Sequence, residues 1–288
     1  MPSCITHQLI SEEALENLPE EANFAAKRYS DYYFLGAQGP DLFFFYKPLS
    51  KKEFNLGRFL HRNGVYTVFS LFAEYLEECG GEEKNRVAAY LAGYICHYCA
   101  DTQFHPYVYR YLGARGATKS EHQLIESDWD VYFARERGKR AAGWKFPFSP
   151  AQINREGALF RLYTALYEAL GRKPIEKKSF ERGVKLFARY LKFFHKKSRA
   201  KFWRGAEKLF RIEPLMSSLY PRNETNPAYL YGEEFEALSG AKNADELFAR
   251  AKEETARLCN LFFYAAACGD PLPREEFSKS FLTAEFVK

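Results

Sequence analysis

The sequence has few cysteines and no long apolar run, and each shortage excludes a class of protein. It also has only six histidines. Its six cysteines are scattered over 288 residues, which excludes a disulfide framework. The longest stretch without an acidic residue, lysine or arginine spans 87–100 and is too short to cross a bilayer as a helix. No basic flank precedes an apolar segment near residue 1, so we expect no secretory signal peptide and a cytoplasmic protein.

Strand patterns are scarce as well, whereas apolar residues at helical spacing are frequent. The composition, 47% hydrophobic and 27% charged, is that of a folded chain rather than a disordered one. No internal repeat is visible. We therefore predict an all-α, multi-helix bundle in which residues 1–288 form one domain. Its expected parts are a histidine-bearing half at 1–135, a basic helical segment at 172–211 and C-terminal helices at 228–288.

Apolar periodicity predicts the positions of the helices. One helical stretch covers 56–76 with a break at Asn63-Gly64, and a second begins at 87 and ends near Asp101. The spacing of Thr118 and Glu121 is that of a capping box, which predicts a helix reaching about residue 133. Further helices are expected at 151–170, 176–210 and 243–267, and loops at 36–40, 112–117, 138–150 and 220–227.

Positive charge is concentrated in the segment 172–211. Fifteen Lys and Arg against three Glu give this segment a net charge of +12, which leaves −7 for the rest of a chain of net charge +5. Aromatic residues alternate with the basic ones. This pattern is compatible with a surface for an anionic membrane or nucleic acid, and equally with an ordinary amphipathic helix that buries its aromatic side chains.

Five of the six histidines lie within the first 122 residues. His97 and Asp101 are four residues apart, His105 follows after four more, and His122 and Glu126 repeat the spacing. Residues i and i+4 project from one face of a helix, where an imidazole and a carboxylate can together bind zinc. A single pair of this kind arises often by chance, but two pairs, joined by His7, Asp41 and His61, would supply ligands for more than one ion.

Cys96 and Cys99 flank His97 but are expected to point away from the face that carries His97 and Asp101. We interpret them as small buried residues rather than as a redox pair. His195, the sixth histidine, lies among basic residues and is assigned no metal role.

Five stretches of the N-terminal 130 residues, in order and spacing, resemble the zinc-dependent phospholipase C family. They are THQLI at 6–10, GAQGPDLFFFYKP at 36–48, GRFLHRNG at 57–64, AGYICHYCADTQFHPYVY at 92–109 and EHQLIESDWD at 121–130. The resemblance implies an all-α fold that binds a cluster of three zinc ions. The family is related in fold to single-strand-specific zinc nucleases, and both groups hydrolyse phosphate esters.

The resemblance also implies a ligand set for each ion. Asp41, His61 and His97 would hold the first zinc, and Asp101 would bridge it to a second that His7 also binds. The third zinc would be held by His105, His122 and Glu126. In secreted members an N-terminal tryptophan chelates the second ion. This sequence has no such tryptophan. The amine of Pro2, exposed if Met1 is removed, is one substitute, and the alternative is a second site that is weaker, differently ligated or empty.

The chemistry expected from such a cluster is hydrolysis by a metal-activated water, with Asp41 orienting or deprotonating that water. Choline-selective relatives carry aromatic residues at the positions of Leu42 and Arg58, so a choline headgroup is disfavoured here and Arg58 can instead meet a phosphate or carboxylate. The aromatic run 43–46 is interpreted as core, with a role in an acyl or base slot as the alternative.

Three functions follow from these observations. The first is a zinc-dependent phosphodiester hydrolase of the phospholipase C type, acting on phospholipids or related diesters. The second is a single-strand nuclease, for which the segment 172–211 would track the nucleic acid. The third is a non-catalytic zinc-binding protein that docks on an anionic surface. The sequence predicts no oligomeric state.

Overall fold

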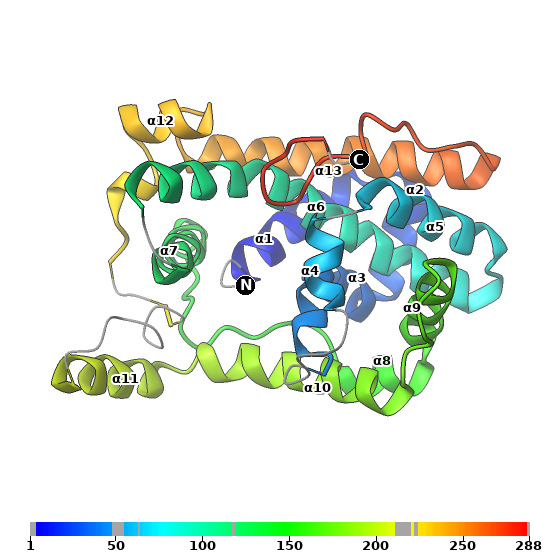
Figure 1. Cartoon of the computed structure of the whole chain (residues 1–288), viewed down its shortest axis with the longest axis horizontal. Helices are drawn as coiled ribbons and strands as arrows, with labels where there is room; N and C mark the ends of the chain where they lie inside the picture. Colours follow the sequence, from blue (N-terminus) through cyan, green and yellow to red (C-terminus); the bar gives the residue numbers. More distant parts are fainter. Residues whose placement is uncertain are drawn as a thin grey trace.

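The computed structural model describes residues 4–47, 55–62, 64–116, 119–210, 220–221 and 224–286 (Figure 1). Within these ranges the fold is all-α, as predicted, and the extended backbone forms only isolated bridges, between Tyr231 and Asn243 and between Lys279 and Phe286. The N-terminal elements are α1 (Cys4–Ala14), η1 (Leu15–Asn17), α2 (Glu20–Arg28), α3 (Ser30–Gly36), η2 (Gly39–Phe45), α4 (Leu56–Arg62) and α5 (Val65–Glu78). They are followed by α6 (Gly81–Arg115), α7 (Lys119–Glu136), α8 (Pro150–Glu156), α9 (Ala158–Ala169), α10 (Lys177–Phe194), α11 (Lys197–Phe210), η4 (Pro227–Tyr229), α12 (Glu233–Ser239) and α13 (Ala244–Cys268).

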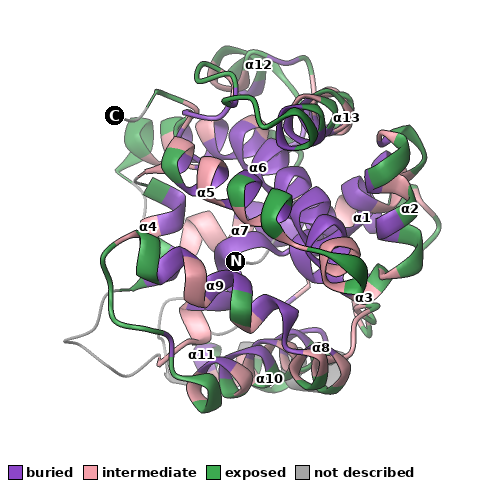
Figure 2. Ribbon diagram, turned by 90° about the vertical axis from the view of Figure 1, so that its right-hand side faces the viewer, coloured by how far each residue is buried: buried purple, intermediate pink, exposed green. Residues whose placement is uncertain are grey.

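The long helix α6 forms the centre of the molecule, with α2, α3 and α13 packed along it (Figure 1). Its residues 87–102 are all buried, and Figure 2 shows this helix in purple inside the other elements. A helix that is apolar on every side must be covered on every side, which explains why this segment lacks the one-sided pattern of a surface helix. Three of the residues predicted to bind metal, His97, Asp101 and His105, lie in its middle part.

The crossing of α3 and α6 depends on two glycines. A Cβ placed on Gly93 would lie 2.0 Å from the carbonyl oxygen of Tyr33, and one on Gly36 would lie 2.1 Å from that of Tyr90. Both contacts are with backbone, which cannot move as a flexible side chain does. Because η2 and Asp41 follow directly after α3, this close crossing also sets how near Asp41 comes to α6.

Gly93→Ala is therefore expected to destabilise the fold by about 3 kcal/mol, the upper range for overpacking a core. Gly113→Ala, on the same helix with nothing within 4 Å of its added Cβ, is the matched control. It should leave stability unchanged or raise it by about 0.5–1 kcal/mol, because alanine is the better helix former. Urea denaturation of the two variants measures the difference, and equal midpoints would contradict the prediction.

The predicted end of the central helix near Asp101 is wrong. The helix continues through Pro106 to Arg115. Residues 112–115 of the predicted loop at 112–117 are therefore helical, and Gly116 ends the helix in a left-handed conformation at φ 59°. Proline removes one backbone hydrogen bond from a helix. Here that loss is outweighed by the burial of aromatic side chains on the following turns, such as Tyr107 and Tyr111.

Two other predicted helices are each divided in two. The segment 151–170 breaks at Gly157, whose φ of 71° ends α8 and begins α9. The segment 176–210 breaks after His195, between α10 and α11. The break at Asn63-Gly64 is confirmed on its described side, since Gly64 at φ 61° precedes α5, whereas Thr118 lies outside the described residues. The loop at 138–150 is confirmed up to Ser149.

Cys96 and Cys99 are fully buried and belong to different parts of the core, as their interpretation as small packing residues requires. All six cysteines are free thiols. None of the helices in the described ranges is long and apolar enough to cross a membrane.

Candidate metal centre

Three of the predicted residues project from one face of α6. His97 Nε2 lies 3.2 Å from Asp101 Oδ2, and the same oxygen lies 3.4 Å from His105 Nδ1. The spacing of four residues places them one helical turn apart. All three side chains are buried, with residue exposures of 8% or less. The helix continues past Asp101, so this row of ligand-type side chains is held on one rigid element.

Two further residues come from the facing helix α7. Glu126 Oε1 lies 3.2 Å from His122 Nε2 and 3.2 Å from His105 Nε2. The three side chains thus meet between α6 and α7. Glu126 is buried and His122 is half-buried at the edge of the group.

The other three residues come from separate elements that converge on Asp101. His7 on α1 places Nε2 3.3 Å from Asp101 Oδ1, and its ring stacks on that of His97 at 4.2 Å between centroids. His61 on α4 places Nε2 3.3 Å from Asp41 Oδ1 and 3.8 Å from Asp101 Oδ2. Asp41 is carried by η2, the element that follows the α3–α6 crossing.

All eight residues therefore lie in one cluster, arranged as three groups. In each group the ligand-type atoms lie within 4.8 Å of one another. Two of the groups are the sets that the resemblance implies for the first and third zinc ions. The remaining group contains the expected pair of His7 and Asp101 together with His97, which also belongs to the set of the first ion. The groups are Asp41, His61 and His97; His7, His97 and Asp101; and His105, His122 and Glu126.

The cluster has the properties of a metal site without help from the resemblance. His97 Nε2, Asp101 Oδ2 and His7 Nδ1 are buried and make no hydrogen bond. Buried polar atoms in proteins are almost always satisfied, so these atoms require a further partner. Imidazole nitrogens and carboxylate oxygens are the donors that zinc accepts, and zinc fits the cluster on this chemistry.

Backbone carbonyls orient the imidazole rings. His61 Nδ1 lies 2.6 Å from the carbonyl oxygen of Gly57, and His97 Nδ1 lies 3.2 Å from that of Ala37. A carbonyl only accepts, so Nδ1 carries the proton in both rings and Nε2 is left with its lone pair facing the cluster. His105 Nδ1 contacts the carbonyl oxygen of Phe281 at 2.9 Å in the same manner.

The electrostatics of the cluster favour ionised carboxylates. Burial alone would raise the pKa of Asp101 and Glu126. The neighbouring histidines outweigh it for Asp101, and positive charges that include His122 outweigh it for Glu126, so both pKa values are held well below the ordinary range. The pKa of Asp41 is also lowered against its burial, with His61 among the causes. Burial lowers the pKa of His105, yet Asp101 and Glu126 more than reverse this and raise it to about 9.

The metal-free protein is accordingly expected to lose stability as the pH rises from about 6.5, the ordinary pKa of histidine, to about 9. His105 contributes fully below the lower value, and its contribution is lost as the pH passes the folded-state pKa, on the order of 3 kcal/mol in total. Chemical denaturation of chelated protein at both ends of this range, with His105→Gln for comparison, measures the loss. Parallel pH dependence in the two proteins would contradict it.

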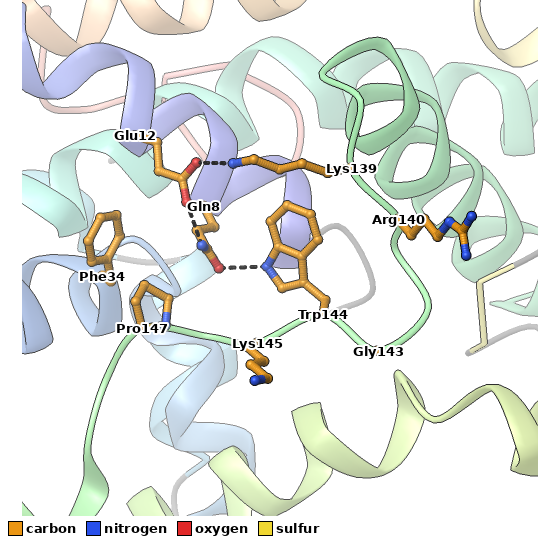
Figure 3. Close-up of a pocket in the computed structure, with 9 residues that line it drawn as sticks. All are labelled: Gln8, Glu12, Phe34, Lys139, Arg140, Gly143, Trp144, Lys145 and Pro147. Atoms are coloured by element: carbon orange, nitrogen blue, oxygen red, sulfur yellow. Dashed lines mark hydrogen bonds and ion pairs between the residues drawn. The ribbon is translucent and has the colours of Figure 1, made fainter.

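The helix α1, which carries His7, is fixed on both sides of that residue. Thr6 donates from its backbone nitrogen and its hydroxyl to Asp130 Oδ1, both at 2.8 Å. On the other side, Trp144 Nε1 donates to Gln8 Oε1 at 2.8 Å, and Gln8 in turn donates to Glu12 (Figure 3). These anchors come from α7 and the loop after it, and they set the depth at which His7 enters the cluster.

A family model described as zinc dependent phospholipase C matches residues 6–196 of the chain. The chain belongs to this family. The matched residues include all eight side chains predicted to bind zinc. No curated protein and no solved structure matches the chain.

In this member of the zinc-dependent phospholipase C family, the cluster opens into a pocket of about 520 Å³. Arg58 and Arg62 line it together with Phe44 and Tyr109. Arg58 is exposed at the edge of this pocket, whereas Leu42 is buried and does not line it.

The aromatic run 43–46 is divided between the core and the pocket. Phe43 is buried against Tyr163, as the core interpretation predicted. Phe44 instead lies beside the ring of His61, at 5.5 Å between centroids, and lines the pocket. The interpretation of the whole run as core is therefore wrong for Phe44.

His195 takes no part in the cluster. It is buried, its Nδ1 lies 2.7 Å from the carbonyl oxygen of Leu191, and burial lowers its pKa.

Sequence reasoning missed two residues that shape the cluster. Gly39, at φ 51°, lies against the ring of His97, and Phe281 contacts the cluster from the far end of the chain. The ring of Phe281 lies 5.4 Å from that of His61. A glycine next to a predicted ligand was a usable signal for the first. Nothing near residue 281 signalled the second.

Proposed function

We propose that the chain is a phosphodiester hydrolase of the phospholipase C type that uses zinc bound by this cluster. The observation that carries the proposal is the convergence of eight ligand-type side chains, at the base of a pocket whose mouth carries two arginines. We further propose that residues 1–288 act as one domain, since Phe281 completes a centre built mainly by the first 126 residues.

Each of the three groups would hold one zinc ion, with His97 common to two of the groups and Asp101 next to a histidine of each of the others. Bound zinc supplies Lewis acidity toward phosphoryl oxygens and lowers the pKa of water, which is the chemistry phosphodiester hydrolysis requires. The second ion depends on His7, His97 and Asp101, and we propose the amine of Pro2 as its remaining ligand. Residues 1–3 lie outside the described structure.

The protein groups around the cluster have separate roles. Asp41, ionised and buried beside His61, accepts a proton from the attacking water and orients it. Arg58 and Arg62 attract the negatively charged phosphate to the mouth. The ring of Phe44 and the side chain of Leu282 give the pocket an apolar wall for the rest of the substrate. The absence of aromatic residues at positions 42 and 58 supports a headgroup other than choline.

Metal analysis combined with hydrolysis assays tests the proposal. Metal-replete protein is incubated with phospholipids of several headgroups, with bis-aryl phosphates and with single-stranded DNA, and bound zinc is counted by elemental analysis. We expect hydrolysis of phospholipid and its loss after chelation. Faster cleavage of DNA would favour the nuclease alternative. A single tightly bound zinc with no hydrolysis of any diester would favour the non-catalytic alternative.

A further inference from the structure

Six cations form a row along the outer side of α10 and just past its end. Their spacing alternates between four and three residues, so the five within the helix lie on one of its faces, and Lys196 follows after the helix ends at Phe194. All six side chains are exposed. We call them the cationic stripe: Lys178, Arg182, Lys185, Arg189, Lys192 and Lys196.

The opposite face of α10 is occupied by the core. Phe180, Phe187 and Leu191 are buried there, and the helix is green only on the side turned away from the other helices in Figure 2. The stripe therefore has no packing role within the chain. Among the described residues, no carboxylate lies within 4.0 Å of the charged atoms of any of its six members, although half-buried Glu181 lies alongside.

The stripe lies in a strongly positive part of an otherwise negative chain. The stripe lies in the segment of net charge +12, while the rest of the chain carries −7. Unpaired cations held this close repel one another, and the repulsion is relieved when an anionic surface neutralises several at once. A flat row of this kind is complementary to a plane of phosphate groups.

The carboxyl-terminal end of the stripe borders an apolar cavity. Lys192 and Lys196 line a space of about 550 Å³ together with Phe146, Phe148 and Leu191. A cation at the rim and apolar side chains within match a lipid, whose phosphate and acyl chain need those two environments side by side.

We propose that the cationic stripe docks the protein on a bilayer that contains anionic phospholipids. A single-stranded nucleic acid fits less well, because it needs aromatic rings on which bases stack. The aromatic residues of α10 that alternate with the stripe turn inward. Phe180 and Phe187 are buried, and Tyr190 packs against Phe45.

The inference rests on the proposed function and deepens it, since a bilayer is where a phospholipid substrate lies. The test measures binding rather than hydrolysis, so that its failure is distinguishable from failure of the proposed function. Protein is sedimented with vesicles of phosphatidylcholine alone or of phosphatidylcholine with phosphatidylglycerol, at low and high salt. The substituted protein carries Arg182→Gln, Lys185→Gln and Arg189→Gln.

Binding is expected only to vesicles with phosphatidylglycerol, and it should weaken at high salt. Each cation near an anionic bilayer strengthens binding about fivefold, so the triple substitution should weaken it on the order of 100-fold. The control protein carries Lys27→Gln, Arg135→Gln and Lys242→Gln, which removes the same charge from exposed positions on α2, on α7 and just before α13, and it should bind nearly as the parent does. Equal zinc content shows that both proteins are folded.

Three results would overturn the proposal. They are equal binding to the two kinds of vesicle, equal weakening by the two triple substitutions, and binding of single-stranded DNA with no binding to vesicles. The last would assign the stripe to nucleic acid instead.

Discussion

Asp101→Asn is expected to lower phosphodiester hydrolysis by more than about 100-fold and to reduce the amount of bound zinc. Asp101 lies within 4 Å of four imidazoles, those of His7, His61, His97 and His105, and no other residue of the cluster contacts as many. Loss of a partner outside the ligand shell already costs metal sites about 10- to 100-fold, so loss of a shared ligand should exceed that range.

The substitution keeps the shape of the side chain and removes its charge, so the effect reports on metal binding rather than on packing. Elemental analysis and initial hydrolysis rates measure it. Asp270→Asn removes the same charge from an exposed position and should change neither quantity. Full zinc content with full activity in Asp101→Asn would show that Asp101 is not a ligand.

Gly39→Ala is expected to disturb the same metal centre, because it adds a methyl group against the ring of His97. A Cβ at this position would lie 2.3 Å from Cδ2 of His97, which belongs to two of the three groups. The ring must move away, and misplacement of a reacting group by about 1 Å can cost about 100-fold in rate. The variant should therefore lose zinc as well as activity, even though residue 39 contributes no ligand.

The backbone at residue 39 also matters, because φ of 51° disfavours any residue with a Cβ. Gly138→Ala separates this strain from the clash, since Gly138 has φ of 65° and nothing within 4 Å of an added Cβ. It should cost only about 1–2 kcal/mol of stability and leave zinc content unchanged. Equal zinc loss in the two variants would show that the contact with His97 is unimportant.

The parts of the centre that follow helical spacing could be predicted from the sequence. His97 and Asp101 share a face of α6 because they are four residues apart, whereas His105 joins them on that face because the helix continues past its predicted end near Asp101. That His7, Asp41 and His61 would join them was inferred from the family resemblance, since their distances in sequence say nothing of their distances in space. The structure brings them together through the packing of α1, η2 and α4 around α6.

Other features could not be predicted because they depend on tertiary packing. The central helix continues beyond Pro106 because burial of the aromatic residues that follow it stabilises the helix by more than one lost hydrogen bond costs. The local sequence shows the proline but not this burial. The contact between His105 and Phe281 spans 176 residues, and no pattern near residue 281 marks it. The inward turn of the aromatic residues on α10, by contrast, was one of the two interpretations of the segment 172–211, and burial of Phe180 and Phe187 agrees with it.

The contact of His105 with Phe281 has a consequence for the time at which the centre forms in the cell. A ribosome adds about 5–20 residues per second, so residue 281 follows residue 105 by roughly 10 to 35 seconds. During that interval the ring of His105 lacks the carbonyl that orients it, and the surface beside His61 is uncovered. The complete centre is therefore assembled only after residue 281 has been synthesised, long after the last of its eight ligand-type residues, Glu126.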